Sequence, residues 1–498
     1  MNTFLSNLSA GPLQGLRCLS VLVLTGLLGA CAVGPDYERP AIAVGESYKE
    51  IEGWTVARPD DAGLRGDWWR LYDDASLNRL MDTLLTSNLN IAQAEAQYRE
   101  AQALVSSAQA GFYPTVGTSA SVTRSGSGNG QGGSDISSGA GNSSNQFALS
   151  GIVSWEPDVW GRVRRSVQAS QAGLQASAAD IASTRLSMQS TLAQTYFRLR
   201  ALDAEQRLLQ ETVEAYERSL TMTQNRLAAG VAAQADVAVS RTQLENTRTQ
   251  LLALAWQRAQ FEHAIAVLLG QAPSSFDLDM MQTVGTVPEI PVALPSQLLE
   301  RRPDVAAAER RTAAANAQIG VAQAAWFPDL TLSAQGGFRS GQWAQWLTAP
   351  FSFWSLGPAL AYTVFDGGAR RAQVDQSRAA YDAQVAAYRL TVLSALREVE
   401  DYLVQLYVLG QEQTTQGRAL ESARESLRLT QNQYEAGLID YLSVVQVETT
   451  ALSTERAAIS LMADRLVVSV QLITALGGGW DVDAPMAAPQ LTPVPNQP

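Results

Sequence analysis

Apolar residues recur in alternating steps of three and four along the second half of the chain. The stripe runs from Tyr381 to Tyr434, and its first part consists of Val385, Tyr388, Val392, Ala395, Val399, Tyr402, Leu406 and Leu409. Such spacing is typical of a coiled-coil seam. Residues 161–229 carry a looser pattern of two stripes, and neither this segment nor 368–436 contains proline. At 1.5 Å per residue, each segment predicts one helix of roughly 100 Å, which no compact globule accommodates.

Four shorter segments alternate with a period of two. Residues 115–122, 147–155, 330–335 and 356–364 place apolar or aromatic side chains at every second position, with small or polar ones between them. This pattern predicts β-strands with one apolar face. That face points to the core in a soluble sandwich, but to lipid in a transmembrane barrel, whose strands have about 9–11 residues. Because a barrel needs about eight strands to close, four strands per chain predict that several copies share one barrel.

The order of these segments repeats along the chain. Residues 109–114 recur as 323–328, 161–165 as 367–371, 227–231 as 434–438, and 268–270 as 475–477. Four landmarks in one order predict a tandem duplication, with repeats at 76–285 and 286–478. Each repeat is expected to run helix, strand, loop, strand, long helix, glycine turn, helix. Residues 31–75 precede the repeats, and residues 479–498 form a tail.

The two loops between the predicted strands differ in composition. Residues 124–146 are almost entirely Gly, Ser, Asn and Gln, so they cannot bury a core. Residues 340–355 instead contain Trp343, Trp346, Phe351, Phe353 and Trp354. These aromatic residues favour a packed loop or an aromatic belt at a membrane interface.

Composition excludes several classes of function. Only 17% of residues are charged, and the chain has one histidine and two cysteines. It therefore has no His or Cys cluster for a zinc or iron site, and we expect no enzyme, metal or cofactor. His263 is expected to be a partly buried polar side chain. The net charge of −12 repels nucleic-acid phosphates, so nucleic-acid binding is not expected.

The first thirty residues indicate a targeting segment. Arg17 is their one charge, and the apolar run at 19–30 is shorter than the ~20 residues that span a bilayer. Residues 28–31, Leu-Gly-Ala-Cys, resemble the lipobox of bacterial lipoproteins. That resemblance implies cleavage before Cys31, which would carry a diacylglycerol on sulfur and an acyl chain on its amino group. The alternative is an ordinary cleavage site with a chance cysteine. Ala32, rather than Asp, follows Cys31 and favours outer-membrane delivery.

Glycine turns separate the helices of each repeat. Gly230 and Gly437 each end a long helix, where a left-handed residue is expected. Asp236 and Asp440 follow a few residues later, where capping of the next helix is the simpler role for both. Asp440 could also form a ring of three carboxylates at a closed mouth. The pairs Arg164-Arg165 and Arg370-Arg371 open the long helices, where we expect lipid-headgroup contact or structural pairing.

Several longer motifs resemble one family. Residues 31–40, 299–305, 313–322 and 365–368 are similar to characteristic stretches of TolC-like outer-membrane efflux channels, in their lipoprotein branch of the NodT and OprM type. The resemblance covers nearly the whole mature chain and departs in loop 124–146 and after Gly479.

The resemblance implies an α+β membrane channel, assembled as a homotrimer with a twelve-stranded β-barrel and a coiled-coil helical tunnel in the periplasm. Residues near 41–75 and the tail would form an equatorial belt. The resemblance further implies a passive duct in the outer membrane of a Gram-negative bacterium. By the same resemblance, we expect it to export small toxic compounds or drugs from an inner-membrane pump of the resistance-nodulation-division (RND) class, through a periplasmic adaptor.

The family's gate places a Tyr before the tip glycine and charged residues after it. Tyr434 matches the Tyr, although its position in the seam gives it a packing role as well. Ile439 and Gln446 stand where some relatives have charged residues, so a salt-bridged gate is not required. Two other functions stay open from the sequence: a structural coiled-coil lipoprotein without a pore, and an exit duct for secreted proteins. The paired strands favour a channel over the structural alternative.

Overall fold

The computed structural model of the chain describes residues 32–42, 45, 48–50, 66–126, 143–281, 285–290 and 302–478. The chain divides into two compact units. Unit 1 consists of Met1–Pro40, Glu100–Gln175 and Glu309–Ala386, and unit 2 of Ala41–Arg99, Ala176–Ala308 and Ala387–Pro498. Each unit therefore contains parts of both repeats.

The helices confirm the predicted order of elements in both repeats. The first repeat contains α3 (Leu89–Ala110), α4 (Arg162–Ala228) and α5 (Gln234–Leu268), and the second α7 (Pro303–Ala324), α8 (Ala369–Glu435) and α9 (Tyr441–Ala475). Corresponding helices have equal lengths of 22, 67 and 35 residues. Equal lengths require matched turn positions, which is the structural consequence of the duplication.

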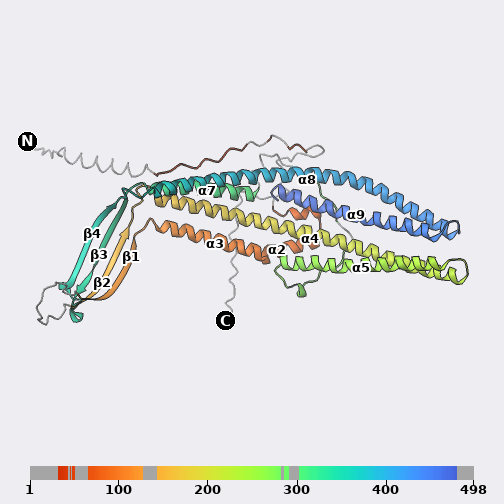
Figure 1. Ribbon diagram of the computed structural model, residues 1–498, viewed down its shortest axis with the longest axis horizontal. Coiled ribbons are helices and arrows are strands. Elements are labelled where there is room, and N and C mark those ends of the chain that lie inside the picture. Colours follow the sequence, from red (N-terminus) through yellow and green to blue (C-terminus); the bar gives the residue numbers. More distant parts are fainter. Residues whose placement is uncertain are drawn as a thin grey trace, which may run out of the picture. The chain divides into compact units, whose positions relative to one another are not determined.

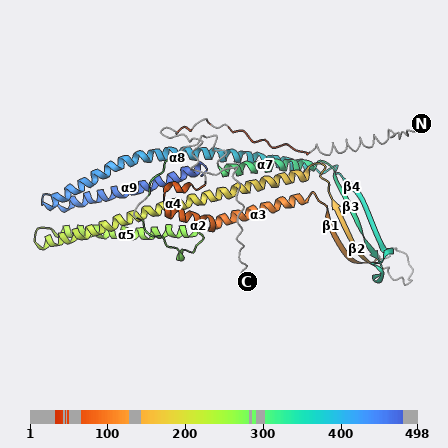
Figure 2. The same ribbon diagram turned by 180° about the vertical axis from the view of Figure 1, so that it is seen from behind.

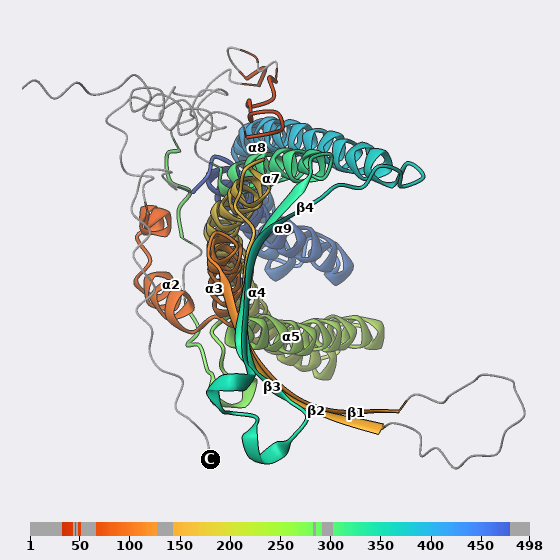
Figure 3. The ribbon, with the colours of Figure 1, turned by 90° about the vertical axis from the view of Figure 1, so that its left-hand side faces the viewer.

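Unit 1 contains one antiparallel sheet in the order β1-β2-β3-β4 (Figures 1 and 3). The strands are β1 (Thr115–Gly126), β2 (Ser143–Trp155), β3 (Asp329–Ser340) and β4 (Ser352–Ala361). Pairing of β2 with β3 joins the two repeats. Figure 3 shows that the strands curve along their length.

The predicted strand ends were wrong at three places. Arg124 and Ser125, assigned to the polar loop, pair with Asn145 and Ser144, because ladder bonds override their weak strand propensity. Phe353 and Trp354, assigned to the aromatic loop, belong to β4. That strand ends at Ala361 rather than near residue 364, because β3 begins at the facing residue and offers no partner beyond it. Residues 127–142 of the polar loop lie outside the described range.

Unit 2 contains α5, α9 and the larger parts of α4 and α8, whose first turns belong to unit 1. The α4–α5 pair and the α8–α9 pair form two helical hairpins (Figures 1 and 2). A 3-10 helix, η2 (Trp68–Tyr72), and α2 (Ala75–Ser87) complete the core with buried Trp68 and Trp69. Asp74 caps α2 by accepting hydrogen bonds from the backbone of Ser76 and Leu77. Three further 3-10 helices are short: Pro273–Ser275 in unit 2, and Trp343–Gln345 and Ala349–Phe351 in unit 1.

The coiled-coil stripe of the second repeat is confirmed on α8 from Tyr388 to Leu406, whereas Gln413 is exposed and the stripe is only half-buried from Gln416 to Thr430. Tyr388, Val392, Ala395 and Val399 are at most 1% exposed, and Leu406 is also buried. They pack with apolar residues of α9 such as Leu466 and Leu472. Among the described helices, α9 alone is long and apolar enough to cross a membrane by composition. Its apolar residues belong to the core of unit 2, so we assign it as a core helix.

Candidate functional site

The strand register sorts the sheet into two chemically different faces. On one face, Val116 lies opposite Val153, Val153 opposite Ala334, and Ala334 opposite Leu356. On the other, Ser119 lies opposite Ser150, Ser150 opposite Gly337, and Gly337 opposite Phe353. The predicted alternation is thus confirmed across all four strands, and the apolar positions share one face.

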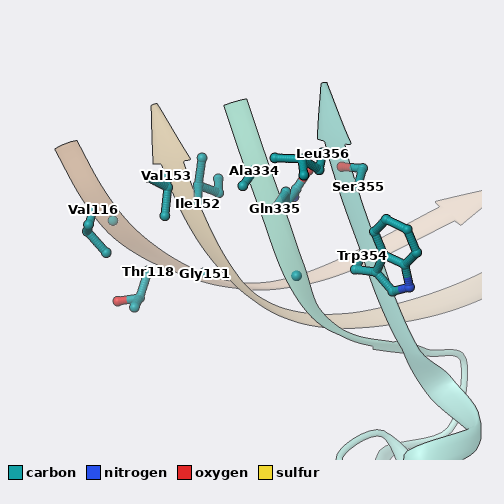
Figure 4. A pocket seen from close by; sticks show the side chains of 12 residues that line it. Val116, Thr118, Gly151, Ile152, Val153, Ala334, Gln335, Trp354, Ser355 and Leu356 are labelled. Atoms are coloured by element: carbon teal, nitrogen blue, oxygen red, sulfur yellow. The ribbon is translucent and has the colours of Figure 1, made fainter. Parts of the chain in front are cut away.

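The apolar face is exposed in the single chain. Val116 and Leu356 are each 75% exposed and Trp354 is 83% exposed. The sheet has a shallow hollow of about 420 Å³, and the strand register places Gly151 and Gly336 side by side there, between Thr118 and Trp354. Figure 4 shows the side chains that line it, among them Val116, Trp354 and Leu356. A soluble monomer rarely exposes a contiguous apolar area of this kind, so this face requires an apolar environment.

Aromatic side chains gather at both ends of the sheet. At the end where the strands meet the helices, Trp160 stacks on Phe327 with 4.8 Å between ring centroids and donates a hydrogen bond to the Pro328 carbonyl. At the opposite end, Trp343 stacks on Trp346, and Phe147 contacts both rings. An apolar band between two aromatic groups is the arrangement of a transmembrane β-strand region.

The sheet has two open edges. Among the described residues, β1 pairs only with β2, and β4 pairs only with β3. Their outer N–H and C=O groups therefore have no strand partner within this part of the chain. Such edges cannot persist in lipid, where every backbone polar group needs a hydrogen-bond partner.

Residues 32–40 lie against the helices of unit 1. The buried Arg165 side chain donates hydrogen bonds to the Val33 carbonyl at 3.1 Å and the Gly34 carbonyl at 3.0 Å, and pairs with Asp36 at 3.0 Å. Asn316 donates to the Pro35 carbonyl. The first and third of the motif segments that resemble the family thus contact each other, which the sequence did not reveal.

A close backbone approach explains one glycine pair in this contact. A Cβ on Gly34 would lie 2.5 Å from the Gly320 Cα atom, and Gly34 has a φ of +107°. The chain therefore holds residues 32–40 on unit 1.

The arginine pairs at the starts of the long helices have structural roles: Arg164 pairs with Asp158, and Arg370 with Asp366. Arg371 is exposed, and its nearest ion-pair partner is Asp375 at 3.9 Å.

The tip turns of the two hairpins have the predicted glycine geometry. Gly230 and Gly437 have φ values of +75° and +74°. The N–H of Val231 donates to the Arg226 carbonyl, and the N–H of Leu438 donates to the Gln433 carbonyl. This is the Schellman pattern of a helix C-terminus, in which a left-handed residue turns the chain sharply back.

The two tip aspartates stabilise the following helices in different ways. Asp440 is the N-cap of α9, and its Oδ1 accepts hydrogen bonds from the hydroxyl and the backbone N–H of Ser443. These bonds lower the pKa of the Asp440 carboxyl below its ordinary 3.8. Asp236 is not an N-cap: Ala233 holds that position, and the Asp236 carboxylate accepts a bond from the Ala233 N–H at 3.0 Å.

Tyr434 packs between the two hairpins. Its ring centroid lies 5.5 Å from that of Tyr441, and the Arg226 guanidinium lies 4.6 Å above the ring. Arg226 belongs to α4, so this contact joins the hairpins. Arg226 was not among the residues expected at the gate. It lies four residues before the tip Gly230, and its counterpart in the second repeat is Gln433 rather than Tyr434.

The other residues singled out from the sequence fall into three cases. In unit 2, Tyr434 precedes the tip glycine Gly437 and contacts Arg226, which precedes Gly230; Asp440 caps α9, and Asp236 lies in the first turn of α5. Cys31 lies outside the described residues. His263 is exposed on α5, so its expected partial burial was wrong: the helix buries a face carrying Leu244, Leu254 and Ile265 instead.

Comparisons with known proteins agree on one family. The family model described as "Outer membrane efflux protein" matches residues 80–271 and 294–478. The chain is 31% identical over 468 residues to the outer membrane protein OprJ of Pseudomonas aeruginosa, covering 93% of this chain and 96% of OprJ. It is 29% identical over 472 residues to the toluene efflux pump outer membrane protein TtgC of Pseudomonas putida, covering 93% and 95%.

The fold comparison gives the same answer. The solved structure of the outer-membrane channel OprN matches with a TM-score of 0.82 and 30% identity, covering 90% of this chain and 100% of OprN. The fold of this chain is thus that of a known outer-membrane channel. The chain belongs to the outer membrane efflux protein family: it is a passive channel component of an efflux system in the outer membrane of a Gram-negative bacterium, and not an enzyme.

Proposed function

We propose that three copies of the chain form one continuous duct, with a twelve-stranded β-barrel in the outer membrane and a tunnel of coiled-coil helices in the periplasm. The observation that carries this proposal is the four-stranded sheet with one apolar face and two open edges. Four strands cannot close a barrel, whereas three sets of four can. Pairing β1 of one copy with β4 of the next satisfies both edges of every sheet.

The duct is anchored by lipid at Cys31. Two features support this assignment: the lipobox-like residues before Cys31, and the contacts that Arg165 and Asn316 make with residues 33–36. Those contacts hold the residues after Cys31 on the unit that contains the sheet. The anchor is a covalent diacylglycerol and acyl modification and plays no chemical part in transport.

The tip turns form the periplasmic gate. Tyr434 holds the α8–α9 hairpin against α4 through Arg226, so separation of the hairpins must break this contact. Asp440 is exposed and ionised down to low pH, because Ser443 stabilises its carboxylate. Three such carboxylates at one mouth attract cations and select for them.

An inner-membrane pump of the RND class supplies the energy, and a periplasmic adaptor docks on the helical tips. The cargo is small toxic compounds, in keeping with the toluene efflux pump in the name of TtgC. A passive duct distinguishes its cargo by width and charge, so the pump determines which compounds enter.

Planar-bilayer recording of the purified protein tests this proposal. The wild-type protein is expected to give small, cation-selective conductance steps. Asp440→Asn keeps a capping oxygen, because Asn is as good an N-cap as Asp, and it is expected to lose cation selectivity. Asp236→Asn is the matched control at the other tip turn and is expected to keep more of the selectivity.

Two results would contradict parts of the proposal. No conductance from a folded, membrane-inserted sample would argue against a duct. Unchanged selectivity in Asp440→Asn would remove Asp440 from the mouth and leave it a helix cap alone. Co-purification of an RND-class pump and its adaptor with the tagged protein would identify the partners.

A further inference from the structure

A carboxylate occupies the seam of α9 near its N-terminal end. The buried residues of this segment are Tyr441, Val444, Glu448 and Ala451, in steps of three, four and three. This is coiled-coil spacing, and Glu448 takes a core position in it with 8% of its surface exposed. Charged side chains are almost never fully buried unless they are paired, so this glutamate needs a physical explanation.

The carboxylate of Glu448 lacks sufficient partners in the part of the chain that the structure describes. Oε1 accepts one long hydrogen bond of 3.4 Å from the Gln431 amide of α8. Oε2 is buried with no hydrogen-bond partner. Burial raises the pKa of Glu448 above its ordinary 4.5, and the Gln431 bond offsets only part of this effect. The protonated form is therefore the one that this site favours.

The described groups around Glu448 supply no positive charge that offsets an ionised carboxylate. Tyr216 of α4 and Tyr441 of α9 both feel its charge, which adds to burial in raising their pKa values, to about 12 for Tyr216. On α5, the buried positions of the matching segment are Ser240, Leu244 and Thr247, and Arg248, the next residue along α5, is paired with Glu217 and Glu245. On α8, Gln431 is an uncharged amide, Arg428 is paired with Glu425, and Arg424 is paired with Glu455 of α9. Arg226 of α4 lies over the Tyr434 ring. No cation among the described residues compensates an ionised Glu448.

The same seam joins the two hairpins. Tyr441 of α9 shares hydrogen bonds with Ser219 of α4 at 3.0 Å and Ser240 of α5 at 3.2 Å. Gln243 of α5 donates to Tyr216 at 3.1 Å and to Thr449, next to Glu448, at 3.2 Å. An ionised Glu448 therefore places an uncompensated negative charge within the contact that holds α4–α5 against α8–α9.

We propose that Glu448 is a proton-binding site that controls the contact between the two hairpins: the protonated carboxyl stabilises the packed tip, and the ionised carboxylate favours separation of the hairpins. The ligand is a proton, bound through an O–H bond to a carboxylate oxygen, and no other reactant is needed. Separation exposes the carboxylate to water, where its charge is solvated. This goes beyond the proposed duct, because it concerns the packing of one chain's own helices.

The direction of the pH effect follows from the linkage between proton binding and packing of the tip. The packed tip has the raised pKa, and the separated tip has a pKa near the ordinary value. Below that ordinary value both states are protonated, and the proton favours neither. As pH rises above it, the separated state loses its proton first, so the packed tip becomes progressively less stable. Each pKa unit between the two states corresponds to about a tenfold change in their ratio.

Hydrogen exchange of the full-length protein in detergent, followed by mass spectrometry, tests this directly. Protection factors, corrected for the intrinsic pH dependence of exchange, report local opening. In the wild-type protein, peptides from 219–243 and 431–451 are expected to be more protected at pH 5 than at pH 8. In Glu448→Gln, which resembles the protonated side chain, protection is expected to stay at the low-pH level at both values.

Two internal controls accompany the measurement. Glu435→Gln makes the same chemical change at an exposed site of α8 near the tip and is expected to keep the wild-type pH dependence. Peptides from β3 report whether each variant is folded. Equal wild-type protection at pH 5 and pH 8 would overturn the proposal without any variant, as would an unchanged pH dependence in Glu448→Gln. Because the readout is local opening and not transport, failure here is separate from failure of the duct.

Discussion

Tyr434 has a role that local sequence rules explain only in part. Its place in the heptad stripe predicts burial, and the structure confirms it. Its contact with Arg226 depends on a residue more than 200 positions away, which spacing along one helix cannot reveal. Glu448 and Arg165 are similar cases: each looks like an ordinary surface charge in the sequence, and each is buried by partners from distant segments. Gly230, Gly437 and Asp440 were predictable because helix capping is local.

Replacing Tyr434 tests whether this contact keeps the tip closed. Tyr434→Ala removes the ring pair with Tyr441 and the cation–π contact with Arg226, at a cost of about 1–2 kcal/mol. We expect a modest rise in single-channel conductance, because other seam residues share the closure. Tyr434→Phe keeps both ring contacts and is expected to conduct like the wild type. Equal conductance in Tyr434→Ala and wild type would place the constriction elsewhere.

Among the secondary-structure elements, the ends of helices were more predictable from the sequence than the ends of strands. The two long helices were predicted with ends within one residue, because missing prolines and flanking glycines agree in both, and a strict heptad stripe supports the second. Strand ends were less predictable, because a strand stops where its partner stops. Thus Arg124 and Ser125 are paired despite being polar, whereas Tyr362 and Val364 are unpaired despite their alternation. The inside-outside pattern across the sheet was still correct, since it depends only on the period of two.

Two glycine-to-alanine substitutions in the second repeat compare the stability contribution of the tip turn with that of the helix that leads to it. Gly437 has a φ of +74°, and a Cβ there would meet no atom within 4 Å, so Gly437→Ala has a purely conformational cost of about 1–2 kcal/mol. Gly417 lies in the interior of α8, where a Cβ also meets nothing, so Gly417→Ala is expected to stabilise by up to about 1 kcal/mol.

Thermal unfolding of the two variants in detergent provides the comparison. The midpoint temperature is expected to fall for Gly437→Ala and to rise or stay unchanged for Gly417→Ala. A fall of equal size in both would mean that the loss of glycine flexibility, and not the left-handed turn, determines stability at this end of the helix.

In a single copy of the chain, neither water nor lipid is a favourable solvent for the whole sheet. Water disfavours the exposed apolar face with Val116, Trp354 and Leu356, and lipid disfavours the open edges of β1 and β4. The sequence predicted this conflict from the number of strands alone. It could not give the assembly by itself, because strand count excludes a monomeric barrel without fixing how many copies close it.

Native mass spectrometry of the detergent-solubilised, full-length protein measures the number of copies directly. We predict a single species with the mass of three chains, which persists on dilution because each β1–β4 contact between copies satisfies a whole strand edge. A folded species with the mass of one chain, with its sheet intact by circular dichroism, would contradict the shared barrel and with it the proposed duct.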